Sequence, residues 1–336
     1  MEKFEVIKVY DRRGGEKENC HRAHAIVMDA HGGILESWGD ITQVVCPRSS
    51  LKFIQALPLV ETGAANALAL NEAFLTLSCA SHNGETEHCE KVGSWLSQLG
   101  LLDGDLECGG HWPIQREAEH ELVQSQEKFC NVHNNCSGKH AGMLSVCKHM
   151  GWPLKGYTEA KHDLQLYIKN IISEMSDTPM DQIKTVIDGC SAPNYFLPFE
   201  NIARMFSRFM SGHGLSDKRA QACQTLMRAV VRHPYLIAGK KRFCSDLVAA
   251  SQGDLLGKVG AMGNFILLAP KAQKIIYAKI EDGNGVAVET VICALMKRFD
   301  LWSDLHEQKI KHYAQPIIKN CRELDVGDIC VVFPEG

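Results

Sequence analysis

Apolar and polar residues alternate at both ends of this 336-residue chain, which is the pattern of half-buried β-strands. Two apolar runs near the start flank the polar turn 29–33, an arrangement typical of a β-hairpin. Two further runs late in the chain are separated only by the polar connection 270–273. The strands that these patterns predict are 4–10, 24–28, 34–38, 263–268, 274–280 and 326–333.

The middle of the chain changes to a helical period, with apolar residues three and four positions apart, as at Phe53, Ala56 and Val60. The predicted helices are one beginning at 49, then 85–99, 138–150, a helix around 164–171, 198–210, 216–232 and 286–299. Strands at both ends with helices between them predict an α+β fold, in which one antiparallel sheet is built from both chain termini and flanked by helices, with an inserted helical lobe.

We expect one domain over residues 1–336. Its sheet lobe would comprise about 1–48 and 245–300, and its helical lobe about 49–244. The charged stretch that begins near Leu301 is expected to form a C-terminal extension, 301–336.

Charge and hydropathy exclude several classes of function. Lys and Arg number 36 against 40 Asp and Glu, so the formal charge is −4, and we expect no nucleic-acid partner. No stretch reaches the roughly 20 apolar residues of a spanning helix, so no membrane partner is expected. The chain starts with acids at Glu2 and Glu5, unlike a secretory leader, which favours a cytoplasmic protein.

The cysteines show no local zinc-binding spacing. There are 14 of them, scattered from Cys20 to Cys330, and none forms a Cys-x-x-Cys pair. A chain of this size needs no disulfides to hold a core, so we interpret most of them as buried, reduced thiols.

Ser49 and Lys52 form a Ser-x-x-Lys spacing, which places a hydroxyl and an amine on one face of a helix. Serine needs a base to become a nucleophile, and lysine serves as that base when burial or a nearby cation lowers its pKa. The spacing alone is weak, because Ser125 with Lys128 and Ser145 with Lys148 repeat it. Only the first copy lies at a predicted strand-to-helix boundary, so we select it as the candidate.

The order of motifs adds a fold-level analogy. Strands, Ser-x-x-Lys, a helical region and then Lys258-Val259-Gly260 beside a late strand follow the order found in penicillin-recognising enzymes and serine glutaminases. That analogy indicates acyl-transfer chemistry.

Six ordered stretches together resemble the bacterial L-asparaginase II family of the rhizobial type. The most specific one reads His-Asn-Asn-Cys-Ser-Gly-Lys-His-Ala-Gly-Met-Leu over 133–144. The six stretches are 48–65, 79–85, 107–113, 133–144, 188–193 and 258–261. In order along the chain, the resemblance covers roughly residues 5 to 300.

The resemblance implies an L-asparaginase with a β-lactamase-like fold, present as a homodimer, and two serine–lysine tandems. These are Ser49 with Lys52 and Ser81 with Lys258. We expect Ser49 to be the nucleophile activated by Lys52, although Ser81 is an alternative, and the product would be L-aspartate with release of ammonia.

The same resemblance implies a zinc ion bound by Cys136, Lys139 and Cys190. Residues beside the motifs would bind the charged groups of the amino acid, since an arginine pairs with a carboxylate and an aspartate pairs with an ammonium group. The expected substrate-binding residues are Arg48, His140 and Asp188, and Cys244 is expected near the pocket.

Two positions depart from the family pattern. Met262 stands where a glutamate is usual after the late lysine, and Val286 follows Asn284 and Gly285 where the family usually has an arginine after Asp-Gly. Two alternatives therefore stay open. One is a related serine amidohydrolase that acts on glutamine or another small amide, and the other is a non-catalytic protein that binds zinc or an amino acid.

Overall fold

The computed structural model describes residues 4–335, and these form two compact units. The first unit comprises Met1–Ser50, Leu197–His213 and Asp246–Gly336, and the second comprises Leu51–Phe196 and Gly214–Ser245. The helix expected over 198–210 thus belongs to the sheet-bearing first unit. The segment expected as a C-terminal extension belongs to the same unit.

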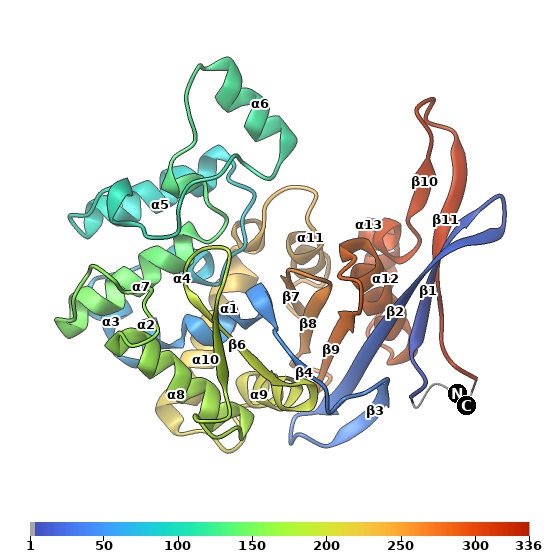
Figure 1. Cartoon of the computed structure of the whole chain (residues 1–336), viewed down its shortest axis with the longest axis horizontal. Helices are drawn as coiled ribbons and strands as arrows, with labels where there is room; N and C mark the ends of the chain where they lie inside the picture. Colours follow the sequence, from blue (N-terminus) through green and yellow to red (C-terminus); the bar gives the residue numbers. More distant parts are fainter. Residues whose placement is uncertain (1–3, 336) are drawn as a thin grey trace. The chain divides into compact units, whose positions relative to one another are not determined.

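An eight-stranded antiparallel sheet forms the first unit (Figure 1). Its strand order is β10-β11-β1-β2-β9-β8-β7, and β3 also pairs with β2. The strands are β1 (Ile7–Arg13), β2 (Glu16–Asp29), β3 (Ile34–Trp38), β7 (Leu256–Gly260), β8 (Asn264–Ala269), β9 (Lys274–Ile280), β10 (Ile317–Lys319) and β11 (Asp325–Val332). The α+β class and the antiparallel sheet built from both chain ends are therefore confirmed.

Helices cover both faces of the centre of this sheet. Successive residues of a strand point to opposite faces, and all six residues of β8 are buried, so neither face is open to water. On one face the Phe199 ring of α9 packs on Tyr277 of β9 at 4.5 Å between ring centroids. The helices of this unit are α9 (Phe199–Ser211), most of α11 (Phe243–Ala250), α12 (Gly285–Arg298) and α13 (Asp304–Ala314).

The first hairpin was not predicted from the sequence. β1 and β2 are joined at Gly14 and Gly15, whose φ angles of 57° and 91° are those that a tight hairpin turn requires. The residues on either side of the turn are polar and exposed, which hid the strand pattern. Backbone pairing with β11 holds this extension, as Arg12↔Asp328 shows.

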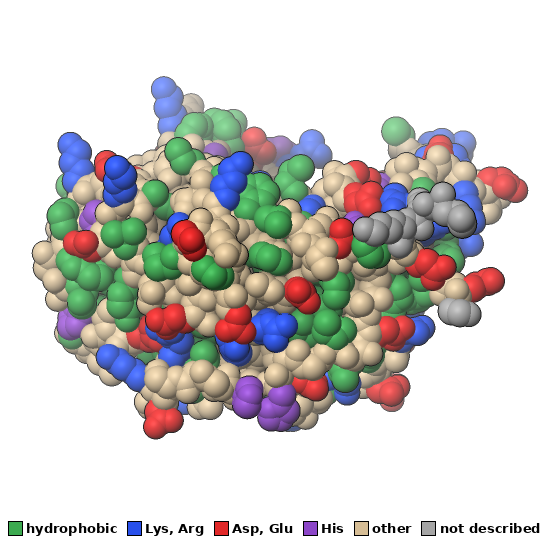
Figure 2. All heavy atoms as spheres, turned by 60° about the horizontal axis from the view of Figure 1, so that its bottom comes forward, with side chains coloured by type: hydrophobic (Ala, Val, Ile, Leu, Met, Phe, Trp, Pro, Cys, Tyr) green, Lys and Arg blue, Asp and Glu red, His purple; other side chains and the backbone are tan. Residues whose placement is uncertain are grey.

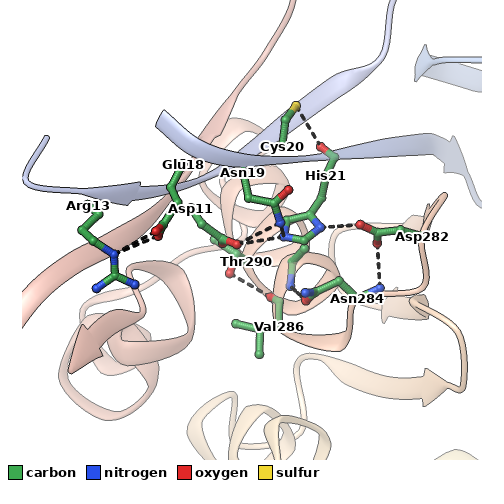
Figure 3. Close-up of polar contacts among 11 residues, drawn as sticks. Asp11, Arg13, Glu18, Asn19, Cys20, His21, Asp282, Asn284, Val286 and Thr290 are labelled. Carbon is green, nitrogen blue, oxygen red and sulfur yellow. Dashed lines mark hydrogen bonds and ion pairs between the residues drawn. The ribbon is translucent and has the colours of Figure 1, made fainter. Parts of the chain in front are cut away.

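A buried histidine ties this hairpin to the turn that precedes α12 (Figure 3). The Nδ1 atom of His21 lies 2.5 Å from Asp282, and its Nε2 atom lies 3.2 Å from Asp11. The Asn19 amide lies within 3.3 Å of the same Nε2 atom. Burial disfavours the charged ring, but hydrogen bonds to Asp282 and Asp11 outweigh it and raise the pKa of His21.

The second unit is mainly helical, and α7 runs through its core. Residues Ser137 to Cys147 of α7 are all buried, and α4 is buried from Ala73 onward. Gly138 permits this close approach, because a Cβ atom there would lie 2.4 Å from the Leu77 carbonyl oxygen. The helices are α1 (Lys52–Gln55), α2 (Leu57–Glu61), α3 (Ala64–Ala67), α4 (Glu72–Cys79), α5 (Thr86–Gln98), α6 (Arg116–Gln124), α7 (Ser137–Met150), α8 (Asp163–Ser176) and α10 (Asp217–Arg232).

Short elements complete the chain. The hairpin of β5 (Lys184–Ile187) and β6 (Pro193–Pro198) encloses the turn 188–192, and the end of β6 pairs with β4 (Val44–Val45). The 3-10 turns are η1 (Arg48–Leu51), η2 (Asp103–Asp105), η3 (Asn131–His133) and η4 (Pro234–Ile237).

The face in Figure 2 mixes basic and acidic side chains and shows no continuous basic patch, in keeping with the formal charge of −4. Within residues 4–335, no helix combines the length and the apolar character needed to cross a membrane.

Candidate active site

Lys52 and Ser81 meet in the second unit. Lys52 is the first residue of α1 and is 1% exposed. Its Nζ atom donates to Ser81 Oγ at 3.0 Å, to the Ala80 carbonyl at 2.5 Å and to the Asn135 carbonyl at 3.3 Å. Three oxygen acceptors hold the amine at one point, so it touches the Ser81 hydroxyl in a fixed geometry.

The chain around Ser81 is held on both sides. α4 ends at Ala80 in extended geometry, and the Ser81 backbone N–H then donates to the Ile237 carbonyl at 3.0 Å. His82 is completely buried, and its Nε2 atom lies 2.9 Å from the Ser137 hydroxyl at the start of α7. These contacts fix the Ser81 turn against the helix that carries the 133–144 motif.

Ser49 lies in the first unit, in η1, and is half-buried. In the chain, η1 is followed directly by α1, which begins at Lys52. The preceding Arg48 has φ 53°, a left-handed conformation that is unusual for a non-glycine residue and clusters at functional sites.

The strand that carries Lys258 packs against the Ser49 turn within the same unit. A Cβ atom on Gly260 would lie 2.3 Å from the Pro47 carbonyl oxygen and 3.1 Å from the Ser50 backbone nitrogen. Only glycine allows this approach, so the Lys-Val-Gly motif and the Ser49 turn are brought together by backbone contact. Lys258 itself is completely buried in β7, and its Nζ atom donates to the Val259 carbonyl at 2.9 Å.

Cys136, Lys139 and Cys190 also come together, although 54 residues separate the two cysteines. Lys139 Nζ lies 3.1 Å from Cys190 Sγ, and both side chains are buried. A hydrogen bond from Cys136 and the Lys139 charge lower the pKa of Cys190, whereas the same hydrogen bond and burial raise that of Cys136. Burial opposes the Lys139 charge, but the Cys190 thiolate raises its pKa.

Asn135 connects this cluster to the serine and lysine pair. Its backbone carbonyl accepts the Lys52 hydrogen bond, and its side-chain oxygen lies 3.1 Å from Cys136 Sγ. Sequence reasoning missed Asn135, because only its place between two motif residues pointed to it.

The donor set fits a zinc ion in chemical type, since it offers two cysteine sulfurs and an amine nitrogen, and the Lys139 nitrogen lies 3.1 Å from the Cys190 sulfur. Thiolate and amine ligands bind the metal after losing their protons. Across residues 4–335, no group of three or more His, Cys, Asp or Glu side chains is arranged to hold a metal. A zinc ion at this cluster would need the Lys139 amine as its third protein donor.

Asp188 and His140 occupy different settings. Asp188 is half-buried, and its carboxylate accepts from Asn194 Nδ2 at 2.9 Å and from the Gly189 backbone at 2.8 Å. Burial opposes its charge, but these donors lower its pKa. His140 is completely buried on α7, with Nδ1 2.7 Å from the Tyr157 hydroxyl, a partner that the sequence did not suggest. Cys244 is buried near the start of α11.

The comparisons with known proteins identify the family of the chain. The sequence model described as L-asparaginase II matches residues 9–331. The chain belongs to the L-asparaginase II family, which supports an activity of the L-asparaginase type. No curated protein sequence matches the chain significantly.

The solved structures found by comparison include two described as β-lactamases and one described as a penicillin-binding protein homologue. A β-lactamase from Mycobacterium bovis shares 14% identity at a TM-score of 0.40, covering 87% of this chain and 94% of that one. A penicillin-binding protein homologue from Pyrococcus abyssi, described as octameric, shares 10% identity at a TM-score of 0.41, and the match covers 85% of this chain and 75% of that one. A putative β-lactamase from Bacteroides dorei shares 10% identity at a TM-score of 0.37, and the match covers 77% of this chain and 84% of that one.

Proposed function

We propose that the protein hydrolyses L-asparagine to L-aspartate and ammonia through a serine acyl-enzyme. The observation that carries this proposal is the buried Lys52 amine 3.0 Å from the Ser81 hydroxyl, within a chain of the L-asparaginase II family. A lysine in such a position can exchange a proton with a serine, which is what amide cleavage by serine requires.

The proposed nucleophile is Ser49, with Lys52 as its base. The Ser49 oxygen attacks the carboxamide carbon as its proton passes to the Lys52 nitrogen, a step that requires Lys52 in its unprotonated form. The lysine then returns the proton to the leaving nitrogen, so ammonia departs and an aspartyl ester remains. Water attacks the ester, the proton returns to Ser49, and aspartate leaves.

Ser81 and Lys258 complete the proposed machinery as proton-relaying and orienting groups. The Ser81–Lys52 hydrogen bond supports the relay role, because it links the Ser81 hydroxyl to the base. Ser81 is also the alternative nucleophile, and the variants below distinguish the two serines.

Recognition of the substrate is assigned to charged side chains beside these groups. Arg48 would bind the α-carboxylate, and Asp188 would bind the α-ammonium group. The lowered pKa of Asp188 supports this role, because the carboxylate stays ionised at neutral pH.

Cys136, Lys139 and Cys190 would hold a zinc ion, which would act as a Lewis acid and orient substrate oxygens when bound. We also propose that the protein is a homodimer, as the family resemblance implies. Light scattering on the full chain tests the homodimer, and a monomeric mass would contradict it.

Ammonia release from L-asparagine, L-glutamine and simple amides tests the function. We expect asparagine to be the best substrate and Ser49→Ala to lose several powers of ten in rate. Ser125→Ala is the matched control, because Ser125 belongs to an exposed copy of the same spacing that directly follows α6, and this variant should keep full activity.

The outcomes separate the alternatives. A chain that prefers glutamine or another amide would be a related amidohydrolase, and its exposed Met262 and Val286 would be the first positions to examine. Tight asparagine binding without turnover, with or without zinc, would refute the proposed enzymatic activity and favour a non-catalytic binding protein.

A further inference from the structure

Asn264 follows the three-residue turn 261–263 between β7 and β8, and its side chain is completely buried. Its Nδ2 atom donates to the Ala261 carbonyl at 2.7 Å, and the Tyr277 hydroxyl of β9 donates to its Oδ1 atom at 2.7 Å. A carbonyl only accepts hydrogen bonds, so the NH₂ group must face Ala261 and the amide oxygen must face Tyr277. Tyr277 is also completely buried, so the Asn264 amide has one defined orientation.

Two donors from β9 hold the rest of this turn. The Lys279 Nζ atom donates to the Met262 carbonyl at 2.9 Å, and the Ile280 backbone N–H donates to the Gly263 carbonyl at 2.9 Å. All three carbonyls of the turn are therefore fixed by groups of β8 and β9.

Asn264 also packs on Gly260, the last residue of β7, which in turn packs on the Ser49 turn. A Cβ atom added to Gly260 would lie 2.3 Å from the Pro47 carbonyl oxygen, 2.9 Å from the Asn264 Cβ atom and 3.1 Å from the Ser50 backbone nitrogen. The Ser50 backbone N–H and hydroxyl both donate to the Pro47 carbonyl, at 3.3 and 2.7 Å, and close the turn that carries Ser49. The Gly260 backbone is thus enclosed between Asn264 and the Ser49 turn.

We propose that Asn264 is a positioning residue, which fixes the end of β7 and so holds the Ser49 turn in the geometry that attack on the amide requires. The inference rests on the proposed function, in which Ser49 is the nucleophile. It gives Asn264 no contact with the substrate, so loss of its side-chain amide should slow the reaction and leave binding of the amino acid intact. A displacement near 1 Å at reacting groups can reduce rate about 100-fold.

Two substitutions remove these hydrogen bonds with little change in side-chain volume. Asn264→Leu removes both bonds of the amide. Tyr277→Phe removes only the donor to Oδ1 and leaves the bond from Nδ2 to Ala261 in place, so we expect it to have the smaller effect.

Ser251→Ala is the matched control, because Ser251 is a buried polar residue of the same unit. Its hydroxyl donates to the Leu247 carbonyl at 2.6 Å and lies 2.9 Å from His306 Nε2. Neither partner belongs to the turn 261–263 or to the Ser49 turn. The control therefore loses buried polar contacts without changing the contacts around Gly260.

The first readout compares catalysis with binding, well below the melting temperature of every variant. We expect Asn264→Leu to lower kcat for asparagine about 100-fold and Tyr277→Phe to lower it by a smaller factor. The Kd for aspartate, measured by calorimetry, should stay close to the wild-type value in both variants. Ser251→Ala should lower the melting temperature and keep wild-type kcat.

Hydrogen exchange of the Ser50 amide is the second readout, and it needs no activity. We expect this amide to exchange faster in Asn264→Leu than in the wild type, and at the wild-type rate in Ser251→Ala. Wild-type kcat or an unchanged Ser50 exchange rate in Asn264→Leu would overturn the proposal, as would an equal loss of kcat in Ser251→Ala. If Asn264→Leu fails to fold, Tyr277→Phe decides by the same criteria. Faster exchange in a protein whose wild type does not hydrolyse asparagine would support the positioning of the turn and refute only the proposed reaction.

Discussion

Gly260→Ala tests whether the contact between β7 and the Ser49 turn supports function. The added Cβ atom would lie 2.3 Å from the Pro47 carbonyl oxygen and 2.9 Å from the Asn264 Cβ atom. Both neighbours are fixed, because one is backbone and the other belongs to an adjacent strand. Overpacking of this kind typically costs about 1–3 kcal/mol, and the turn must move to relieve it. A displacement near 1 Å at reacting groups can reduce rate about 100-fold.

The assay combines thermal unfolding with ammonia release measured well below the melting temperature. We expect Gly260→Ala to lower the melting temperature by a few degrees and kcat by about 100-fold. Gly285→Ala is the control, since its Cβ atom meets nothing within 4 Å, and it should leave both quantities unchanged. Wild-type stability and kcat in Gly260→Ala would refute the role of this contact.

Three further predictions concern ionisation and metal. His88 is stacked between His82 and Tyr235 at 4.9 and 4.8 Å, and burial lowers its pKa from 6.5 to about 4. The His88 ring therefore takes up a proton at a higher pH in the unfolded chain than in the folded chain, so about 3 kcal/mol of folding stability is lost as pH falls from 6.5 to about 4. In urea titrations, His88→Phe should remove that loss. An identical acid slope in both proteins would contradict this prediction. Because folding raises the pKa of His21, its contribution to folding stability is complete below pH 6.5 and is lost as pH rises through the folded-state pKa. Asp282→Asn should therefore destabilise the protein more at pH 6 than at pH 9, and an equal cost at both would exclude the charged pair. Zinc at 100 times its Kd should stabilise the wild type by about 2.7 kcal/mol, and this gain should vanish in Cys190→Ser. A gain that persists in Cys190→Ser would show that the ion binds elsewhere.

Local patterns predicted the regular elements well. Strands β3 and β9 match the predicted ranges 34–38 and 274–280, and the helix predicted at 138–150 begins one residue earlier in the structure. Each of these elements has a clear alternation or helical period, and burial in the core follows that period.

The unpredicted elements depend on contacts that local patterns do not contain. β2 extends through the polar residues from Glu16 to Asn19 because backbone pairing with β1 stabilises it there. β10 is a three-residue edge strand, and only its pairing with β11 distinguishes it from a loop.

Much of the candidate site was beyond reasoning from spacing. The Ser-x-x-Lys spacing suggested Ser49 with Lys52, but the hydroxyl that the structure places on Lys52 belongs to Ser81, 29 residues later. The approach of Cys190 to Lys139 depends on the β5–β6 turn, and the hydroxyl beside His140 belongs to Tyr157, 17 residues later in the chain. Long-range packing determines these contacts, so family resemblance could indicate the residues but not their partners.

The central claim is that a serine acyl-enzyme hydrolyses asparagine. Rapid acid quenching during turnover, followed by peptide mass mapping, tests it most directly. We predict an aspartyl ester on Ser49 that is absent in Ser49→Ala, while Ser125 stays unmodified. Ammonia release from asparagine that persists when Ser49 and Ser81 are both replaced by alanine would contradict the claim.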